Sequence, residues 1–132
     1  MNLPQVLDQL KDDPKFMRNV TCWKYAPAQE AQFSPFPESM PEKLVGALQE
    51  KGIHKLYSHQ AEAVDHVLNG KNVVVVTPTA SGKTLCYNIP SLSAILDDPE
   101  SRALYLFPTK ALSQDQMHEI HEIVTAMEAE IK

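Results

Sequence analysis

Residues 73–84 read "VVVVTPTASGKT", and this stretch decides the fold. Four consecutive β-branched residues without polar alternation are typical of a strand covered on both faces, which is the usual state of a parallel sheet. The letters "GKT" are how a phosphate-binding loop ends, and helical spacing returns over residues 83–96. The pattern G-x-x-x-x-G-K-[ST] has glycine where this chain has Thr77, so the loop departs from the pattern at its first position.

The turn between this strand and this helix is predicted to bind the phosphates of a nucleotide. Successive backbone N–H groups in such a turn face one concavity, and the helix N-terminus adds about half a positive charge. Lys83 can neutralise the outer phosphates, and the Thr84 hydroxyl can hold a magnesium ion. A turn that ends in "GKT" by accident is the alternative, which the strand before it and the helix after it disfavour. The predicted phosphate-binding residues are Thr77, Pro78, Thr79, Ala80, Ser81, Gly82, Lys83 and Thr84, and the last two are the predicted catalytic residues.

A second strand of the buried type, "ALYLF" at 103–107, ends at Pro108 and precedes a helix predicted over residues 110–131. From the valine run onward the order is therefore strand, helix, strand, helix. This order predicts an α/β fold with a parallel sheet and right-handed crossovers. Pro90 lies within helix 83–96 and is predicted to kink it, because proline has no N–H to donate.

Two further helices are predicted upstream of the valine run. Ser39 and Glu42 have the spacing of a capping box, and a helix is expected over residues 41–51. Ser58 resembles the N-cap of a second helix, which should end at Asn69-Gly70.

The N-terminal part of the chain has a different sequence pattern. Apolar residues at helical spacing predict a helix over residues 3–13, and Pro14 stops the pattern. Residues 19–41 contain four prolines and no helical period, so they are expected to form an extended connector. We therefore divide the chain into an N-terminal extension, residues 1–36, and the beginning of a nucleotide-binding domain, residues 37–132.

Composition restricts the class of protein. The chain has 132 residues, of which 43% are hydrophobic, and a formal net charge of −5. No apolar run approaches the ~20 residues of a membrane span, and the first residues do not resemble a signal peptide. Cys22 and Cys86 stand alone, which indicates a reduced, cytoplasmic protein without a zinc ribbon. The negative charge argues against a general electrostatic affinity for nucleic acid, but it leaves room for a local phosphate site.

Together these segments resemble superfamily-2 helicases of the DEAD/DEAH-box type. Their phosphate loop reads A-x-T-G-S-G-K-T, from which "TPTASGKT" differs only by Thr77 and Ala80. As in those helicases, a proline (Pro90) stands seven residues after the loop lysine. "FPTKALSQDQ" is similar to their motif Ia, and "GIHKLYSHQ" is similar to their Q-motif, with Gln60 placed 23 residues before Lys83. The resemblance covers about residues 37–125 and is strongest to the YprA/MrfA branch, which acts in mitomycin repair.

The resemblance implies a RecA-like P-loop domain that uses ATP and magnesium and binds nucleic acid, DNA in this branch. Gln60 would hydrogen-bond the adenine edge. Tyr57 would stack nearby, although a tyrosine of the core fits the sequence equally well. Pro108, Thr109 and Lys110 would contact the nucleic-acid backbone at the start of a helix.

Several parts of such an enzyme are missing from these 132 residues. They contain no D-E-x-H motif to hold magnesium and orient water, and Asp97-Asp98-Pro99 is predicted to end a helix instead. The family also places two strands between those at 73–76 and 103–107, and both normally come later in the chain. We therefore expect a helicase truncated after motif Ia, with negligible hydrolysis by itself. A non-catalytic nucleotide-binding or interaction module is the alternative, whereas a small P-loop kinase would need an arginine-rich lid, and Arg18 and Arg102 are the only arginines.

Overall fold

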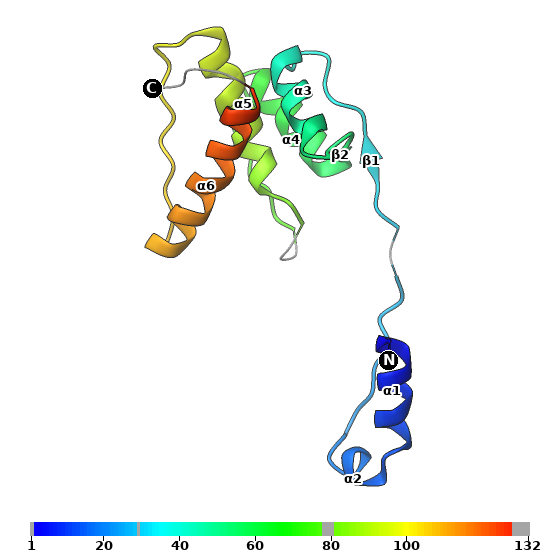
Figure 1. The fold of residues 1–132 in the computed structure, drawn as a ribbon. Helices are drawn as coiled ribbons and strands as arrows, with labels where there is room; N and C mark the ends of the chain where they lie inside the picture. The colour runs from blue at the N-terminus through cyan, green and yellow to red at the C-terminus, as the bar shows by residue number, and fades with distance from the viewer. Residues whose placement is uncertain (1, 29, 78–80, 128–132) are drawn as a thin grey trace. The chain divides into compact units, whose positions relative to one another are not determined.

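A computed structural model describes residues 2–28, 30–77 and 81–127. The chain divides into two compact units, Met1–Glu30 and Ala31–Lys132, each of which is treated by itself (Figure 1). The first unit contains α1 (Leu3–Asp12) and α2 (Pro14–Met17). The second contains β1 (Phe33–Ser34), α3 (Glu42–Glu50), β2 (Leu56–Tyr57), α4 (Ser58–Leu68), α5 (Thr84–Asp97) and α6 (Lys110–Ala126).

In the first unit, side-chain caps begin both helices. The Asn2 side chain accepts from the Gln5 backbone N–H while the Gln5 side chain accepts from Asn2, both at 3.1 Å. Asp13 then accepts from the Lys15 N–H at 2.8 Å, so Pro14 ends α1 and also occupies the first position of α2. No residue of α1 or α2 is buried within the described chain.

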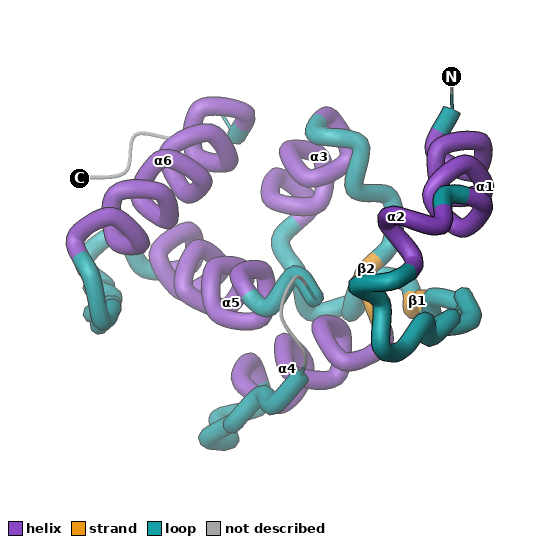
Figure 2. The backbone as a smooth tube through the Cα atoms, turned by 90° about the horizontal axis from the view of Figure 1, so that it is seen from below, coloured by secondary structure: helices purple, strands orange, loops and turns teal. Residues whose placement is uncertain are grey.

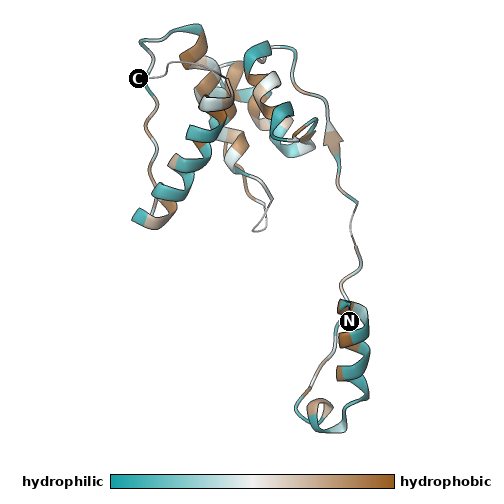
Figure 3. Cartoon of the chain, viewed as in Figure 1, coloured by the Kyte–Doolittle hydropathy of each residue, from teal (hydrophilic) through white to brown (hydrophobic). Residues whose placement is uncertain are grey.

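The second unit is built around a core that all four of its helices share. α4 packs on α5, and α3 packs on both α5 and α6 (Figure 2). α5 is the most extensively buried of these helices, whereas α6 buries Ile123 and is largely hydrophilic along its length (Figure 3). The largest fully buried apolar side chains are Leu44, Leu48, Leu56, Val64, Ile89, Ile123 and Met127.

A short antiparallel pair lies beside these helices and was not predicted. Phe33 of β1 pairs with Tyr57 of β2, and Ser34 pairs with Leu56. β1 lies in the proline-punctuated segment, where two residues of pairing are too few to produce an alternating pattern. The pair brings the connector to the start of α4, since the Ser58 N–H donates to the Gln32 carbonyl at 2.9 Å.

The predicted helices are confirmed, but two predicted caps are wrong. Pro41, not Ser39, precedes α3, and no side chain caps it because the helix begins directly after the extended proline. Ser58 is the first helical residue of α4 and Tyr57 is its N-cap. α6 is described as far as Ala126, and the end predicted at residue 131 lies outside the described residues.

The two predicted strands at 73–76 and 103–107 are not formed as strands. Both segments are extended, yet neither makes a ladder hydrogen bond among the described residues. Val74 and Val76 are each 88% exposed, whereas Val73 and Val75 are half-buried. Leu104 and Leu106 alternate with Tyr105 and Phe107 in the same way. Each segment therefore has the pleat of a strand but lacks the hydrogen-bonded neighbours that would make it one.

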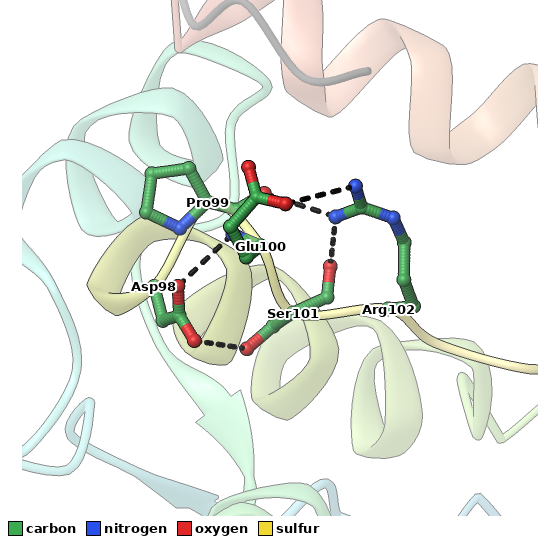
Figure 4. Close-up of polar contacts among 5 residues, drawn as sticks. All are labelled: Asp98, Pro99, Glu100, Ser101 and Arg102. Carbon is green, nitrogen blue, oxygen red and sulfur yellow. Dashed lines mark hydrogen bonds and ion pairs between the residues drawn. The ribbon is translucent and has the colours of Figure 1, made fainter.

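A compact turn follows α5, and Asp98, the C-cap of the helix, takes part in it (Figure 4). Asp98 accepts hydrogen bonds from the Glu100 N–H at 3.0 Å and the Ser101 hydroxyl at 3.4 Å. Arg102 donates to the carbonyls of Pro99 at 3.0 Å and Ser101 at 2.8 Å. The prediction that this acidic stretch ends a helix is confirmed. Within the described part of the chain, no helix has the length and apolar character needed to cross a membrane.

Candidate nucleotide site

The predicted phosphate loop joins the extended valine segment to α5. Its described members are Thr77 and residues 81–84, while Pro78, Thr79 and Ala80 lie outside the described residues. The hydroxyls of Thr77 and Ser81 are 2.5 Å apart, so the two sides of the loop are hydrogen-bonded to each other. Thr77, which stands where the pattern has glycine, thus helps to close the loop.

Lys83 places its ammonium group between the two sides of the loop. Nζ donates to the Thr77 carbonyl and hydroxyl, each at 3.1 Å, and to the Ser81 hydroxyl at 3.2 Å. A cation surrounded by oxygen atoms in this position can exchange them for phosphate oxygens, which would form stronger, charge-assisted bonds.

Burial raises the pKa of the Cys86 thiol at the start of α5, and nearby positive Lys83 opposes that rise. Cys86 therefore stays a neutral thiol near pH 7 and is a poor nucleophile. It serves as a small apolar residue of the helix that carries the loop.

Gly82 has a conformation that favours glycine. Its φ is +69°, in the left-handed region that favours glycine. A Cβ at this position would also lie only 2.6 Å from Nε2 of Gln60. Gly82 therefore permits both the turn of the loop and the close approach of a side chain from α4.

That side chain, Gln60, connects the start of α4 to the loop. It is only 3% exposed, and its Nε2 donates to the Gly82 carbonyl at 2.7 Å. Its Oε1 accepts from the Tyr57 N–H at 2.8 Å. An amide NH₂ has two donors and its oxygen has two lone pairs, so each atom can make a second hydrogen bond. A donor beside an acceptor is the combination that pairs with the N6–N7 edge of adenine.

Three rings stack beside Gln60. The Phe33 and Tyr57 rings lie 5.0 Å apart and 18° from parallel, and the Tyr57 and His59 rings lie 5.8 Å apart and 10° from parallel. Tyr57 is 38% exposed and is therefore a rim residue, not one of the core. Sequence reasoning missed Phe33 and His59, because one lies in an aperiodic connector and the other looks like an ordinary residue of a helix start.

A cavity of about 630 Å³ opens between these residues and the loop. Its lining includes Phe33, Tyr57, Gln60, Gly82 and Thr84. A neighbouring groove of about 640 Å³ runs over α5 between the two extended segments and shares Gly82 and Thr84 with the cavity. The predicted base-binding and phosphate-binding residues thus line one continuous region.

Thr84 is the first residue of α5 and the predicted magnesium ligand. The described residues contain no group of three or more histidine, cysteine or acidic side chains able to hold a metal. A single hydroxyl suits magnesium, which keeps several waters and is often bound through substrate phosphates together with one or two protein oxygens.

The residues predicted to contact nucleic acid begin α6. Thr109 is its N-cap, and its hydroxyl accepts from the Leu112 N–H at 3.3 Å. Pro108, Thr109 and Lys110 are all exposed. No hydrogen bond joins them to the loop among the described residues, but Tyr87 of α5 donates to Gln116 of α6 at 2.5 Å. This bond ties the helix that carries the loop to the helix that begins with Thr109.

Comparison with protein families finds a match to the family described as DEAD/DEAH box helicase, over residues 57–132. The chain is 50% identical over 126 residues to the uncharacterized ATP-dependent helicase YprA of Bacillus subtilis strain 168, a match that covers 96% of this chain and 17% of YprA. It is 43% identical over 102 residues to the ATP-dependent helicase hrq1 of Schizosaccharomyces pombe, covering 76% of this chain and 10% of hrq1.

Among solved structures, the DUF1998 helicase MrfA bound to DNA and AMPPNP matches with a TM-score of 0.88 and 47% identity. The match covers 100% of this chain and 18% of MrfA, so it includes the first 36 residues, which the sequence alone left outside the resemblance. The chain therefore spans less than a fifth of these relatives. The predicted RecA-like α/β fold class is confirmed.

Proposed function

This chain belongs to the DEAD/DEAH box helicase family, and from that premise we propose that it is the ATP-binding part of an ATP-dependent DNA helicase that acts in DNA repair. Because the chain spans only 17% of YprA and 18% of MrfA, unwinding and repair belong to this proposal as activities of a whole protein. The isolated cysteines favour a cytoplasmic location.

One contact carries the proposal. Gln60 donates to the Gly82 carbonyl at 2.7 Å, although the two residues are 22 positions apart in the sequence. A side chain with the hydrogen-bonding pattern of an adenine reader is thereby fixed against a phosphate loop. The base and the phosphates of one nucleotide can bind at its two sides.

We place the nucleotide along this region. Its base would enter the cavity lined by Phe33, Tyr57 and Gln60, where aromatic faces and an amide are available. Its phosphates would lie at the loop, facing the N-terminus of α5 and exchanging with the oxygens that now surround Lys83. Magnesium would arrive with the nucleotide and bind the Thr84 hydroxyl.

The same proposal assigns Pro108, Thr109 and Lys110 to the DNA backbone. A helix N-terminus with an exposed lysine suits a phosphate group and carries no base specificity. The presence of DNA in the MrfA structure supports DNA over RNA as the partner. The net charge of −5 makes a local contact of this kind more plausible than a broad basic surface.

Hydrolysis of ATP requires more of the site than binding of ATP does. In-line hydrolysis requires charge stabilisation around the whole γ-phosphate and an oriented water molecule. Lys83 and Thr84 supply part of that stabilisation, and the 132 residues contain no D-E-x-H motif. We therefore expect this chain to bind ATP without turning it over.

Calorimetric titration of the 132-residue chain with ATP and magnesium tests the proposal. Lys83→Ala should weaken binding by about tenfold or more, because it removes charge-assisted bonds to phosphate. Lys71→Ala, at an exposed lysine outside the loop, is the matched control and should bind like the parent chain. Absence of nucleotide binding by the parent chain would instead favour the alternative, a non-catalytic interaction module. Rapid, DNA-stimulated hydrolysis that Lys83→Ala abolishes would contradict the expected lack of turnover.

A further inference from the structure

His59 and Gln60, consecutive residues in the first turn of α4, bind consecutive carbonyls of the phosphate loop. The His59 Nε2 lies 3.0 Å from the Ser81 carbonyl oxygen, and the Gln60 Nε2 lies 2.7 Å from that of Gly82. A carbonyl oxygen only accepts, so the imidazole is the donor and carries its proton on Nε2. Both bonds join residues 22 positions apart.

Because the peptide bond is planar, a hydrogen bond to a carbonyl group also fixes the direction of the N–H group that follows it. In a trans peptide the C=O of one residue and the N–H of the next point in opposite directions. The bond from His59 to the Ser81 carbonyl therefore directs the N–H of Gly82 away from His59. In the same way, the bond from Gln60 fixes the direction of the Lys83 N–H. Backbone N–H groups of this kind are what a phosphate loop offers to an anion.

The imidazole of His59 is itself held in place. Its ring stacks on Tyr57 at 5.8 Å, and Tyr57 stacks in turn on Phe33 at 5.0 Å. His59 is half-buried, so its donor is partly shielded from competing water. The ring contact restricts the orientation of the imidazole without using either of its nitrogen atoms.

We propose that His59 is a positioning residue for the phosphate loop: through the Ser81 carbonyl it orients the Gly82 N–H toward bound phosphate. Gln60 contacts the loop too, but it also faces the base cavity, so its two tasks cannot be separated by substitution. The hydrogen bond that His59 donates to Ser81 goes to the loop, and His59 does not line the base cavity. The inference rests on the proposed nucleotide site and assigns a role within it.

Two substitutions separate the hydrogen bond from the stacking. His59→Phe keeps an aromatic ring against Tyr57 but removes the donor. His59→Gln removes the ring but places an amide donor at about the length of Nε2. The matched control is His66→Phe, two turns further along α4, where the histidine makes no hydrogen bond to the loop among the described residues.

Each variant of the 132-residue chain is titrated with inorganic tripolyphosphate, ATP and GTP, all with magnesium, and its unfolding midpoint is recorded. His59→Phe should weaken tripolyphosphate and ATP equally, by about fivefold, which corresponds to one ordinary hydrogen bond. The ratio of ATP to GTP affinity should not change, because His59 does not read the base. His59→Gln should recover most of the lost affinity, and His66→Phe should bind normally.

The outcomes distinguish failure of the nucleotide site from failure of the role assigned to His59. If the parent chain binds neither tripolyphosphate nor ATP, the proposed nucleotide site fails and this inference fails with it. If the parent chain binds both and His59→Phe binds equally well, the site stands and the role of His59 is refuted. Loss of affinity in His59→Gln as large as in His59→Phe would also refute it, since the donor would then not be what matters.

Discussion

The side-chain nitrogen of Gln60 lies 2.7 Å from the carbonyl oxygen of Gly82, and a Cβ at residue 82 would come within 2.6 Å of that same nitrogen. A Cβ at this position would therefore displace the Gln60 amide from its present contact with the loop. That contact joins the residue predicted to read the base to the residues predicted to hold the phosphates.

Gly82→Ala should weaken nucleotide binding and destabilise the chain. The φ of +69° costs a residue with a Cβ about 1–2 kcal/mol, and the clash with Gln60 adds to that cost. Chemical denaturation and ATP titration measure the two effects. Gly46→Ala is the control, because Gly46 lies inside α3 with nothing within 4 Å of an added Cβ, and alanine there should stabilise the helix by about 0.5–1 kcal/mol. A Gly82→Ala chain as stable as the parent would contradict the geometry of the loop.

Asn88→Leu should stabilise the second unit. Asn88 of α5 is 0% exposed, and neither its Oδ1 nor its Nδ2 has a hydrogen-bond partner among the residues that the structure describes. An unpaired buried polar group costs about 1–3 kcal/mol, so an apolar side chain of similar size should raise the free energy of unfolding by ~1 kcal/mol. Asn88→Asp should lower it, because a buried charge would also lack a partner. Urea unfolding gives both values, and equal stability of the leucine and aspartate variants would show that Asn88 is solvated.

Lysine in place of exposed apolar residues in the two extended segments, 73–76 and 103–107, should reduce self-association of the chain. Val74, Val76, Leu104 and Leu106 are 84–88% exposed on segments that have no ladder partner among the described residues. Unpaired apolar strands are templates for pairing with another chain. Val74→Lys combined with Leu104→Lys should shift the sedimentation distribution toward monomer. Val75→Lys, on the half-buried side of the same segment, should instead destabilise the fold, and an unchanged distribution in the double variant would argue that these segments do not mediate association.

The ion pair between Lys51 and Glu122 should make stability depend on pH. It joins the end of α3 to α6, and Lys51, through a hydrogen bond and its charge, holds the pKa of Glu122 below its ordinary value of 4.5. A carboxyl group with a lowered pKa in the folded state stabilises it fully above the unfolded value. That contribution disappears as the pH falls through the folded value.

Unfolding midpoints at pH 7 and pH 3 test this dependence. Glu122→Gln should narrow the difference between the two midpoints, whereas Glu50→Gln, at an exposed acid in no described ion pair, should leave it unchanged. A difference that Glu122→Gln does not alter would mean that the pair makes no net contribution, as is common for exposed ion pairs.

The helices of the second unit could be predicted from the sequence because their stripes and stop signals are local. Gly52 and Gly70, for example, follow α3 and α4 with positive φ, as the sequence indicates. The strands could not be predicted with the same success. The valine run has the composition of a strand in a parallel sheet, but a strand exists only when a neighbour accepts and donates its ladder hydrogen bonds.

The candidate site, like the fold, could be predicted only in part from the sequence. The sequence by itself pointed to the loop, its lysine and threonine, and to Gln60 as the predicted adenine reader, because each belongs to a short motif of the family that the sequence resembles. Only the tertiary structure brought Phe33 to Tyr57, His59 to Ser81 and Gln60 to Gly82. These pairs are separated by 22 or more residues, and their distances follow from how β1 pairs with β2 and how α4 packs on α5. No local period records such packing, so the orientation of the loop was decided by the fold.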